Sequence, residues 1–160
     1  MASPGSPSLR SSLPDGTGLR IGIIAARWHD DIVTRLIEGA QRTLVDCGVR
    51  EKDIKLTRCE GAYELPVIAS AWAHKHSVEA IIAIGVVIRG ETPHFEYVAG
   101  PVAYGLTNVA IETMVPCILG VLTTENVEQA LERSGGTHGN KGSEAAIAAI
   151  DTINAIRQLH

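Results

Sequence analysis

Long apolar runs are missing from this sequence of 160 residues. No stretch approaches the roughly 20 consecutive apolar residues that a transmembrane helix needs, so no membrane partner is expected. Positive charge is also scarce, because 18 Asp and Glu outnumber 14 Lys and Arg and leave a net charge of −4. This balance argues against binding nucleic acid or an anionic membrane surface through bulk electrostatics.

Cysteine is rare, with Cys47, Cys59 and Cys117 only, and their spacing does not match a metal site. Their odd number favours buried, reduced thiols in a cytoplasmic protein over a disulfide framework. The run His29-Asp30-Asp31 places its side chains next to one another rather than at the i, i+4 spacing of helical ligands. No metal ion is therefore predicted.

Two nucleotide-binding motifs are also missing. The segment 25–29, Ala-Ala-Arg-Trp-His, contains no Gly-x-Gly-x-x-Gly, which disfavours a dinucleotide fold. The glycine-rich segment 135–142 lacks the Gly-Lys-Ser/Thr of a P-loop and follows a predicted helix rather than a strand. A nucleoside triphosphatase is therefore not expected.

The first 18 residues differ in composition from the rest of the chain, being rich in Ser, Pro and Gly. This composition predicts a flexible arm, and the lack of an apolar stretch argues against a secretory signal. Residues 19–160 are long enough to bury a core and predict one domain.

Short apolar segments alternate with segments of helical periodicity throughout this domain. Strands are predicted over residues 20–26, 53–59, 80–88 and 116–123. Helices are predicted over residues 30–46, 65–76, 94–113, 125–134 and 143–159. Strict alternation indicates an α/β protein, a three-layer flavodoxin-like sandwich around a four-stranded parallel sheet.

Some local features should shape the helices and their ends. The Gly100-Pro101 pair should kink or delay the third helix. Thr124 and Ser143 are candidate N-caps for the last two helices, and the segment 135–142 between those helices is predicted to be a flexible loop.

The segment 85–97 is the most informative stretch of the sequence. It begins as the end of an apolar strand, turns through Arg89-Gly90, and starts a helix near His94. Free backbone N–H groups at a helix start attract anions, and an imidazole at that point can move protons. An anion site combined with an acid/base group is therefore predicted here.

Ligands of open parallel sheets bind beyond the carboxyl ends of the strands. Four segments are expected to meet there: 28–29, 61–64, 87–94 and 119–124. Each side chain also has an ordinary explanation. Trp28 could stack on a planar ligand or be partly buried at an interface, and Glu64 could bind a ligand or complement a helix dipole.

The same choice applies to the other candidates. His94 could be a proton shuttle or an unremarkable helix-start residue, and Arg133 and Lys141 could be solvated charges unless their loop folds over an anion.

Four motifs carry a resemblance to a known family. They are Gly61-Ala-Tyr-Glu-Leu-Pro66, the segment from Gly85 to Tyr97, the segment 120–130, and Arg133 with Gly139-Asn-Lys-Gly142. In this order and spacing they resemble the 6,7-dimethyl-8-ribityllumazine synthases, the riboflavin synthase beta-chain family. The resemblance covers about residues 19–158.

That resemblance implies a transferase-type condensing enzyme. It would join 5-amino-6-(D-ribitylamino)uracil to 3,4-dihydroxy-2-butanone 4-phosphate and form 6,7-dimethyl-8-ribityllumazine, phosphate and water, the penultimate step of riboflavin biosynthesis. It implies no cofactor and no metal. His94 takes the position of the acid/base.

The binding residues are implied in the same way. Those at the positions that bind ribitylaminouracil are Trp28, Ala62, Tyr63, Glu64, Val87, Ile88, Leu119 and Lys141. Those at the positions that bind butanone phosphate are Gly90, Glu91, Thr92 and Arg133. The sequence departs from common family residues at Trp28, His29 and Leu119, where Phe, Asn and Phe are frequent.

The resemblance also implies a homo-oligomer. Five subunits would form a ring, Arg133 and its loop would reach a site shared with a neighbouring subunit, and the arm would add to the adjacent subunit's sheet. The compact loop 135–142 favours a sixty-subunit icosahedral shell. An association with riboflavin synthase is a further partner to be tested.

Two other functions are alternatives to this reaction. A catalytically silent flavin- or lumazine-binding shell protein would not need His94, Arg133 and Lys141 together. A different imine-forming enzyme of phosphosugars would need a lysine at a strand end, and the sequence has none there.

Overall fold

The computed structural model describes residues 12–160 of the chain. The strands are β1 (Ile21–Ala26), β2 (Ile54–Cys59), β3 (Ala80–Ile88), β4 (Cys117–Thr124), β5 (Ser134–Gly136) and β6 (Gly139–Asn140). The helices are α1 (Asp30–Asp46), η1 (Glu51–Asp53), η2 (Ala62–Glu64), α2 (Leu65–Ala73), α3 (His94–Thr113), α4 (Val127–Glu132) and α5 (Lys141–Arg157).

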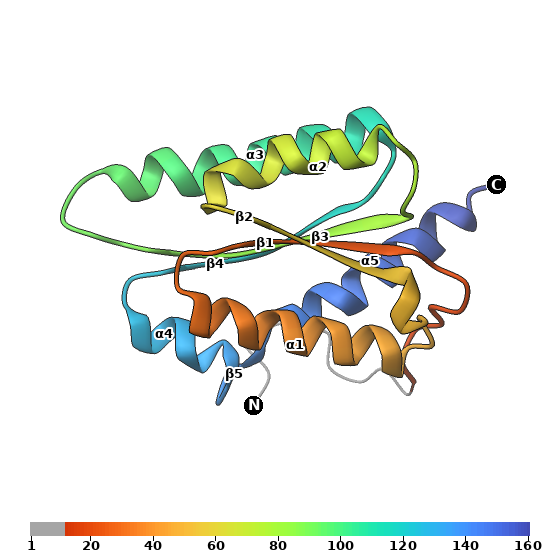
Figure 1. Ribbon diagram of the computed structural model, residues 1–160, viewed down its shortest axis with the longest axis horizontal. Coiled ribbons are helices and arrows are strands. Elements are labelled where there is room, and N and C mark those ends of the chain that lie inside the picture. The colour runs from red at the N-terminus through yellow and green to blue at the C-terminus, as the bar shows by residue number, and fades with distance from the viewer. Residues whose placement is uncertain (1–11) are drawn as a thin grey trace.

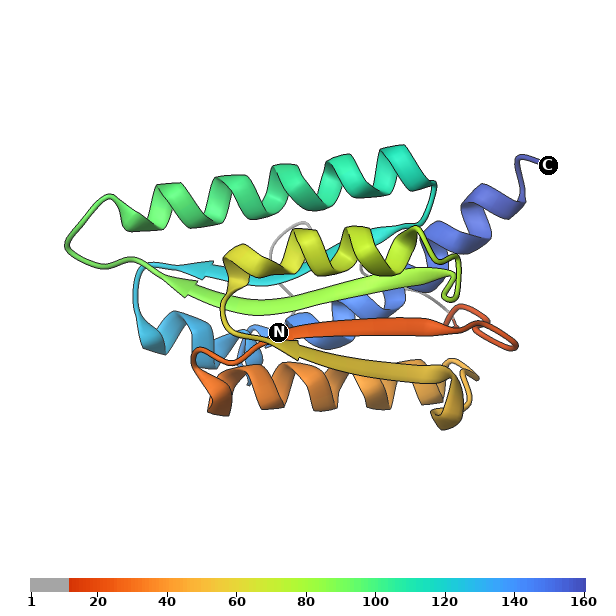
Figure 2. The same cartoon turned by 45° about the horizontal axis from the view of Figure 1, so that its top comes forward.

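Four of the strands form a parallel sheet in the order β2-β1-β3-β4. Helices α2 and α3 cover one face, and α1, α4 and α5 cover the other (Figure 1). The same layers are seen after rotation in Figure 2. The predicted three-layer α/β sandwich with a four-stranded parallel sheet is confirmed.

The buried strands explain the layers. Every residue of β1 is buried, and so is every residue of β3 except the last. Alternate side chains point to opposite faces of a strand, so Ile23 joins the core beneath α1 and α5 while Ile24 joins the core beneath α2 and α3. A sheet that is apolar on both faces needs helices on both faces.

Helix α3 runs from His94 to Thr113 without a break at Gly100 or Pro101. The expected delay of this helix is therefore wrong. Pro101 removes one backbone hydrogen bond, but Val102, Leu106 and Val109 bury one side of the helix. Packing of this kind, rather than local propensity, supplies most of the stability of a helix in a protein.

Both predicted caps are wrong by a few residues. Asn126 caps α4, since its side chain accepts from the N–H of Gln129 at 2.9 Å. Asn140 caps α5 by accepting from the N–H groups of Gly142 and Ser143 at 2.8 and 3.2 Å. Ser143 instead lies in the first turn of α5.

The segment predicted as a loop contains secondary structure. Strands β5 and β6 pair as a short antiparallel hairpin between α4 and α5. The hairpin is attached to α4 because the N–H groups of Thr137 and His138 donate to the side chain and the carbonyl of Glu132, at 2.9 and 3.0 Å. Lys141 N–H donates to the carbonyl of Arg133 at 2.9 Å and joins the two ends.

Residues 1–11 of the expected arm lie outside the described residues. The rest of that segment packs against the domain. Gly16 N–H donates to the carbonyl of Cys47 at 2.7 Å, and the Asn154 side chain donates to the carbonyl of Asp15 at 3.2 Å. Leu19 is buried.

Candidate active site

A cavity of about 760 Å³ opens at the carboxyl ends of β1 and β3. In the sheet, β2 lies on one side of β1 and β3 lies on the other, so the strand order reverses direction between β1 and β3. Ligands of such folds bind at this switch point. Its volume suits a small organic molecule. It is lined by Trp28, His29, Glu60, Gly61, Ala62, Tyr63, Glu64, Val86, Val87, Ile88, His94, Tyr97 and Val98.

Trp28 is held at the mouth by the turn after β1. Arg58 on β2 donates to the carbonyls of Ala25 and Ala26 at 3.2 and 3.0 Å and pairs with Asp30 at 2.6 Å. His29 adopts a left-handed conformation with φ 58° and leads into α1. The turn leaves the Trp28 residue 64% exposed, so its ring is available to a planar ligand.

The turn after β2 supplies a second wall. Ala62 is buried, whereas Tyr63 is 61% exposed and presents its ring to the cavity. One carboxylate oxygen of Glu64 accepts from the N–H of Gly61 at 2.9 Å. Glu64 therefore stabilises the turn and lines the cavity at the same time, so a structural role and a ligand-binding role are compatible.

The end of β3 and the start of α3 form the third wall. Val87 is 8% exposed and, with Ile88, provides the apolar part of that wall. His94 is exposed on the first turn of α3, and its N–H donates to the hydroxyl of Thr92 at 3.4 Å. The first N–H groups of a helix have no partner within it, so the α3 start can accept an anion beside the imidazole.

The structure brings together most of the predicted site. The predicted site residues that line the cavity are His94, Trp28, Ala62, Tyr63, Glu64, Val87 and Ile88. Gly90, Glu91 and Thr92 do not line it, but they lie in the exposed connection that runs from its β3 wall to His94. This part of the site comes from three βα turns of one chain.

Leu119, Arg133 and Lys141 are not among the residues that line the cavity. Leu119 pairs with Ala83 in the sheet, five residues before the end of β4, and is 44% exposed. The expectation that it lies at the carboxyl ends of the strands is therefore wrong. Arg133 follows α4, which packs on the α1 side of the sheet, and Lys141 starts α5.

Several lining residues were not identified from the sequence. Tyr97 and Val98 follow His94 at the i+3 and i+4 positions, which lie on the same face of a helix. That spacing alone could have found them. Glu60 and Val86 are also in the wall; Glu60 directly precedes the Gly61–Pro66 motif and Val86 lies within the motif from Gly85 to Tyr97.

Two of the thiols, Cys59 at the carboxyl end of β2 and Cys117 at the amino end of β4, are poor nucleophiles. Burial raises the pKa of the Cys59 thiol above its ordinary value, with the Glu64 carboxylate adding to the effect. Burial alone raises the pKa of Cys117 to about 11. Since the thiolate is the reactive form, neither side chain contributes nucleophilic chemistry at neutral pH.

Metal sites and membrane spans are both absent from residues 12–160. Within that range no three His, Cys, Asp or Glu side chains gather as metal ligands would. Nor does the same range contain a helix both long and apolar enough to span a bilayer.

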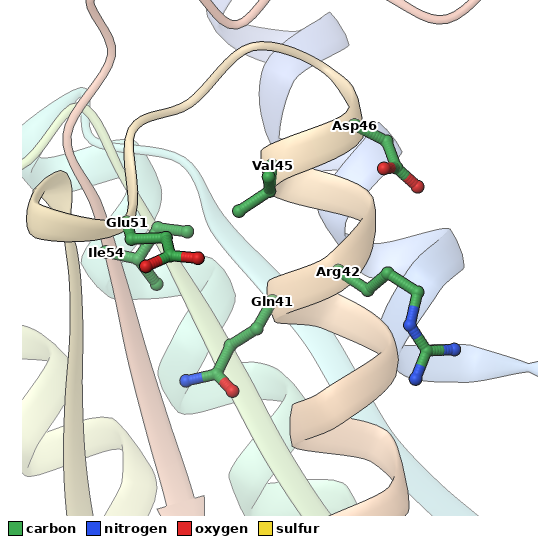
Figure 3. A pocket seen from close by; sticks show the side chains of 6 residues that line it. All are labelled: Gln41, Arg42, Val45, Asp46, Glu51 and Ile54. Carbon is green, nitrogen blue, oxygen red and sulfur yellow. The ribbon is translucent and has the colours of Figure 1, made fainter.

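A second concavity, of about 460 Å³, lies between α1 and the start of β2. Figure 3 shows Gln41 and Val45 facing Glu51 and Ile54, whereas Arg42 and Asp46 turn outward. It lies near the amino end of β2, away from the carboxyl ends of the strands. Its lining contains no histidine and none of the residues predicted for the site.

Comparison with known proteins matches the sequence to one family. The sequence model described as 6,7-dimethyl-8-ribityllumazine synthase matches residues 18–157. A protein of that name from Aquifex aeolicus (strain VF5) is 49% identical over 142 residues, 89% of this chain and 92% of the relative. Another from Syntrophus aciditrophicus (strain SB) is 46% identical over 142 residues, with the same coverage.

Proposed function

This chain belongs to the 6,7-dimethyl-8-ribityllumazine synthase family, and from that membership we infer that it performs the penultimate step of riboflavin biosynthesis. It is a condensing transferase that joins 5-amino-6-(D-ribitylamino)uracil to 3,4-dihydroxy-2-butanone 4-phosphate. The products are 6,7-dimethyl-8-ribityllumazine, phosphate and water. One observation carries the assignment: the family match extends over nearly the whole domain that builds the cavity.

The reaction needs several proton transfers. The substrate amine attacks the ketone and loses water to form an imine. A proton then leaves carbon as phosphate is eliminated, and a second attack closes the ring. His94 is the acid/base in this proposal, since it lies on the cavity wall at the start of α3 and an imidazole transfers protons near neutral pH.

Ribitylaminouracil occupies the cavity between the three turns. Trp28 stacks on the pyrimidine, with Val87 and Ile88 flanking the ring. Ala62, Tyr63 and Glu64 line the ribityl side, where a Glu64 oxygen accepts from hydroxyl groups. The exposure of Trp28 and Tyr63 supports this arrangement, because neither ring is occupied by the chain's own core.

Butanone phosphate binds next to His94. Backbone and hydroxyl donors of Gly90, Glu91 and Thr92 hold the phosphate at the start of α3, and Arg133 supplies the pairing charge. Because Arg133 does not line the cavity of its own chain, it acts in the site of a neighbouring copy. Lys141 and Leu119 also act in the site of a neighbouring copy, where they contact the pyrimidine.

Replacing Arg133 with alanine should raise the apparent KM for butanone phosphate about 30-fold, because a charged hydrogen-bond partner of the phosphate is lost. The KM for ribitylaminouracil should change less than about 3-fold. Steady-state kinetics with each substrate varied in turn makes the measurement. Arg50→Ala is the control, since Arg50 pairs with Asp53 at 2.6 Å near the amino end of β2. An unchanged KM for butanone phosphate would remove the role of Arg133.

The shared site requires a homo-oligomer. Tyr97, Tyr104 and Ile111 recur every seven residues on one side of α3, each at least 70% exposed, and this spacing places them on one face. Met114 continues the stripe with 67% exposure. Such a surface is covered by another protein surface when the chain is assembled. Rings of five copies assembled into a sixty-subunit shell fit this surface and the compact β5–β6 hairpin.

Sedimentation tests the assembly. Sixty chains of 17.0 kDa make about 1,000 kDa, and we expect a particle of that size. A single species at about 85 kDa, the mass of five chains of 17.0 kDa, would limit the assembly to the ring. Cosedimentation with riboflavin synthase tests that association.

The function is tested by mixing the purified protein with both substrates and following lumazine absorbance. Catalysed lumazine formation is expected. A protein that binds lumazine or a flavin without accelerating its formation would be the silent shell alternative, which the family match does not favour. A cytoplasmic location is proposed as well, supported by the absence of a disulfide at Cys59 and Cys117.

A further inference from the structure

The connection between β3 and α3 is exposed along its whole length. Residues 89–94 are all exposed, although they join a buried strand to a helix packed on the sheet. The contact that Thr92 makes there is the 3.4 Å hydrogen bond to the N–H of His94. A segment with so few contacts opens easily unless its ends are held.

Arg89 contacts both ends of this connection. Its N–H donates to the carbonyl of Thr124 at 2.9 Å, which continues the pairing of β3 with β4. Its guanidinium pairs with Glu96 on the first turn of α3 and with Glu125 after β4, the latter at 2.9 Å from Nε. The same guanidinium lies 4.2 Å from the centre of the Phe95 ring. One side chain thus connects three elements across the base of the connection.

This arrangement links the start of α3 to the ends of β3 and β4. Glu96 is two residues after His94, and Phe95 packs against the core beneath α2 and α3. A guanidinium presents its donors in a rigid plane, so pairing with two carboxylates fixes an angle that a single ion pair would not fix. The hydrogen bonds to Glu96 and Glu125 also raise the pKa of Arg89, which is charged at every pH of interest.

We propose that Arg89 is a positioning residue that holds the 90–93 connection and His94 in register with the cavity, through Glu96 and Glu125. This inference rests on the proposed function, in which that connection binds the phosphate of the butanone substrate. Arg89 is not itself the phosphate ligand. Two carboxylates face its single positive charge, so the cluster of three side chains carries a net negative charge that would repel an anion.

The variant Arg89→Met keeps the length of the side chain and removes both ion pairs. The apparent KM for butanone phosphate should rise about 10-fold, because a small displacement of binding groups has large kinetic effects. The KM for ribitylaminouracil should stay within about 2-fold, since Trp28 and Glu64 are held by other contacts. The melting temperature should fall by less than about 3 °C, because exposed ion pairs contribute little to stability.

A double variant separates positioning from direct binding. Glu96→Gln with Glu125→Gln leaves the Arg89 charge in place but removes both of its ionic partners. If Arg89 positions the connection, this variant should raise the KM for butanone phosphate as Arg89→Met does. If Arg89 bound the phosphate directly, freeing its charge would lower that KM, and the proposal would be overturned.

Arg20→Met is the matched control. Arg20 also pairs with a carboxylate, Glu79, but at the start of β1, at the opposite end of the sheet. Its kinetics should equal those of the wild type. Equal increases in both KM values for Arg89→Met would indicate a general disturbance and overturn the positioning role.

Hydrogen exchange followed by mass spectrometry gives a readout that does not need the reaction. Peptides covering residues 95–102, the first two turns of α3, should exchange about 10-fold faster in Arg89→Met than in the wild type, while those covering β1 should not change. Unchanged exchange in 95–102 would overturn the proposal. If exchange accelerates but wild-type protein forms no lumazine, the proposed function fails and the positioning role of Arg89 stands.

Discussion

Replacing His94 with alanine should lower kcat about 100-fold, the lower part of the range for losing a positioned acid/base group. The variant should remain measurably active. Two substrates held side by side react faster than free ones, whatever group moves the protons. The remaining cavity walls should still hold both substrates in this way. The KM values should change little, because the imidazole acts mainly on the reaction steps.

Steady-state kinetics at saturating concentrations of both substrates provides the measurement. His74→Ala is the control: this histidine sits at the end of α2, bonds the carbonyl of Ser70 at 2.8 Å and does not line the cavity. It should match the wild type. A His94→Ala variant with kcat within about 3-fold of the wild type would exclude the acid/base role.

The same variant tests whether two copies share a site. Neither His94→Ala nor Arg133→Ala alone has an intact site in the proposed arrangement. In mixed oligomers, a site with His94 from one copy and Arg133 from its neighbour is intact. Equal mixing should therefore restore about a quarter of the sites. A mixture no more active than the average of the two variants would place the whole site in one chain.

Replacing Gly142 with alanine should destabilise the domain by about 3 kcal/mol, with the melting temperature about 10 °C lower. An added Cβ would lie 1.9 Å from the carbonyl oxygen of Leu36 and 2.7 Å from its carbonyl carbon. Both atoms belong to the backbone of α1, so α5 has to move away from α1 as a whole. Lys141 precedes this contact and would be displaced from its proposed site.

Thermal unfolding followed by circular dichroism measures the loss. Gly100→Ala is the matched control in another helix, since the nearest atom to its added Cβ is Tyr104 Cε2 at 3.9 Å. Alanine is favoured over glycine inside a helix by about 1 kcal/mol, but a Cβ before Pro101 disfavours the helical backbone and offsets that gain. This control should therefore stay close to the stability of the wild type. Equal stability of the two variants would contradict the tight contact between α5 and α1.

Helix ends show why some local predictions were wrong. Ser143 is a good capping residue by type, yet its hydroxyl donates to the carbonyl of Gly39 on α1 at 3.1 Å. Asn140 takes the cap instead, and its amide also reaches the carbonyl of Arg35 at 3.0 Å. The choice between these two residues depended on α1, about 100 positions away in the sequence.

The sequence by itself determined the alternation of strands and helices, because apolar runs and helical periodicity are local properties. It also identified the family and the residues of three βα turns, since each motif is a continuous segment whose place follows from the strand it ends. The cavity at Trp28, Glu64 and His94 was predictable for that reason.

Only the tertiary structure decided which candidates meet within one chain. The sheet order and the packing of α4 and α5 on the α1 side keep Arg133 and Lys141 off the cavity wall, and the strand register places Leu119 five residues before the end of β4. The bridge from Arg89 to Glu125 likewise depends on β3 and β4 being neighbours. These relations are contacts between distant segments, and no local pattern encodes them.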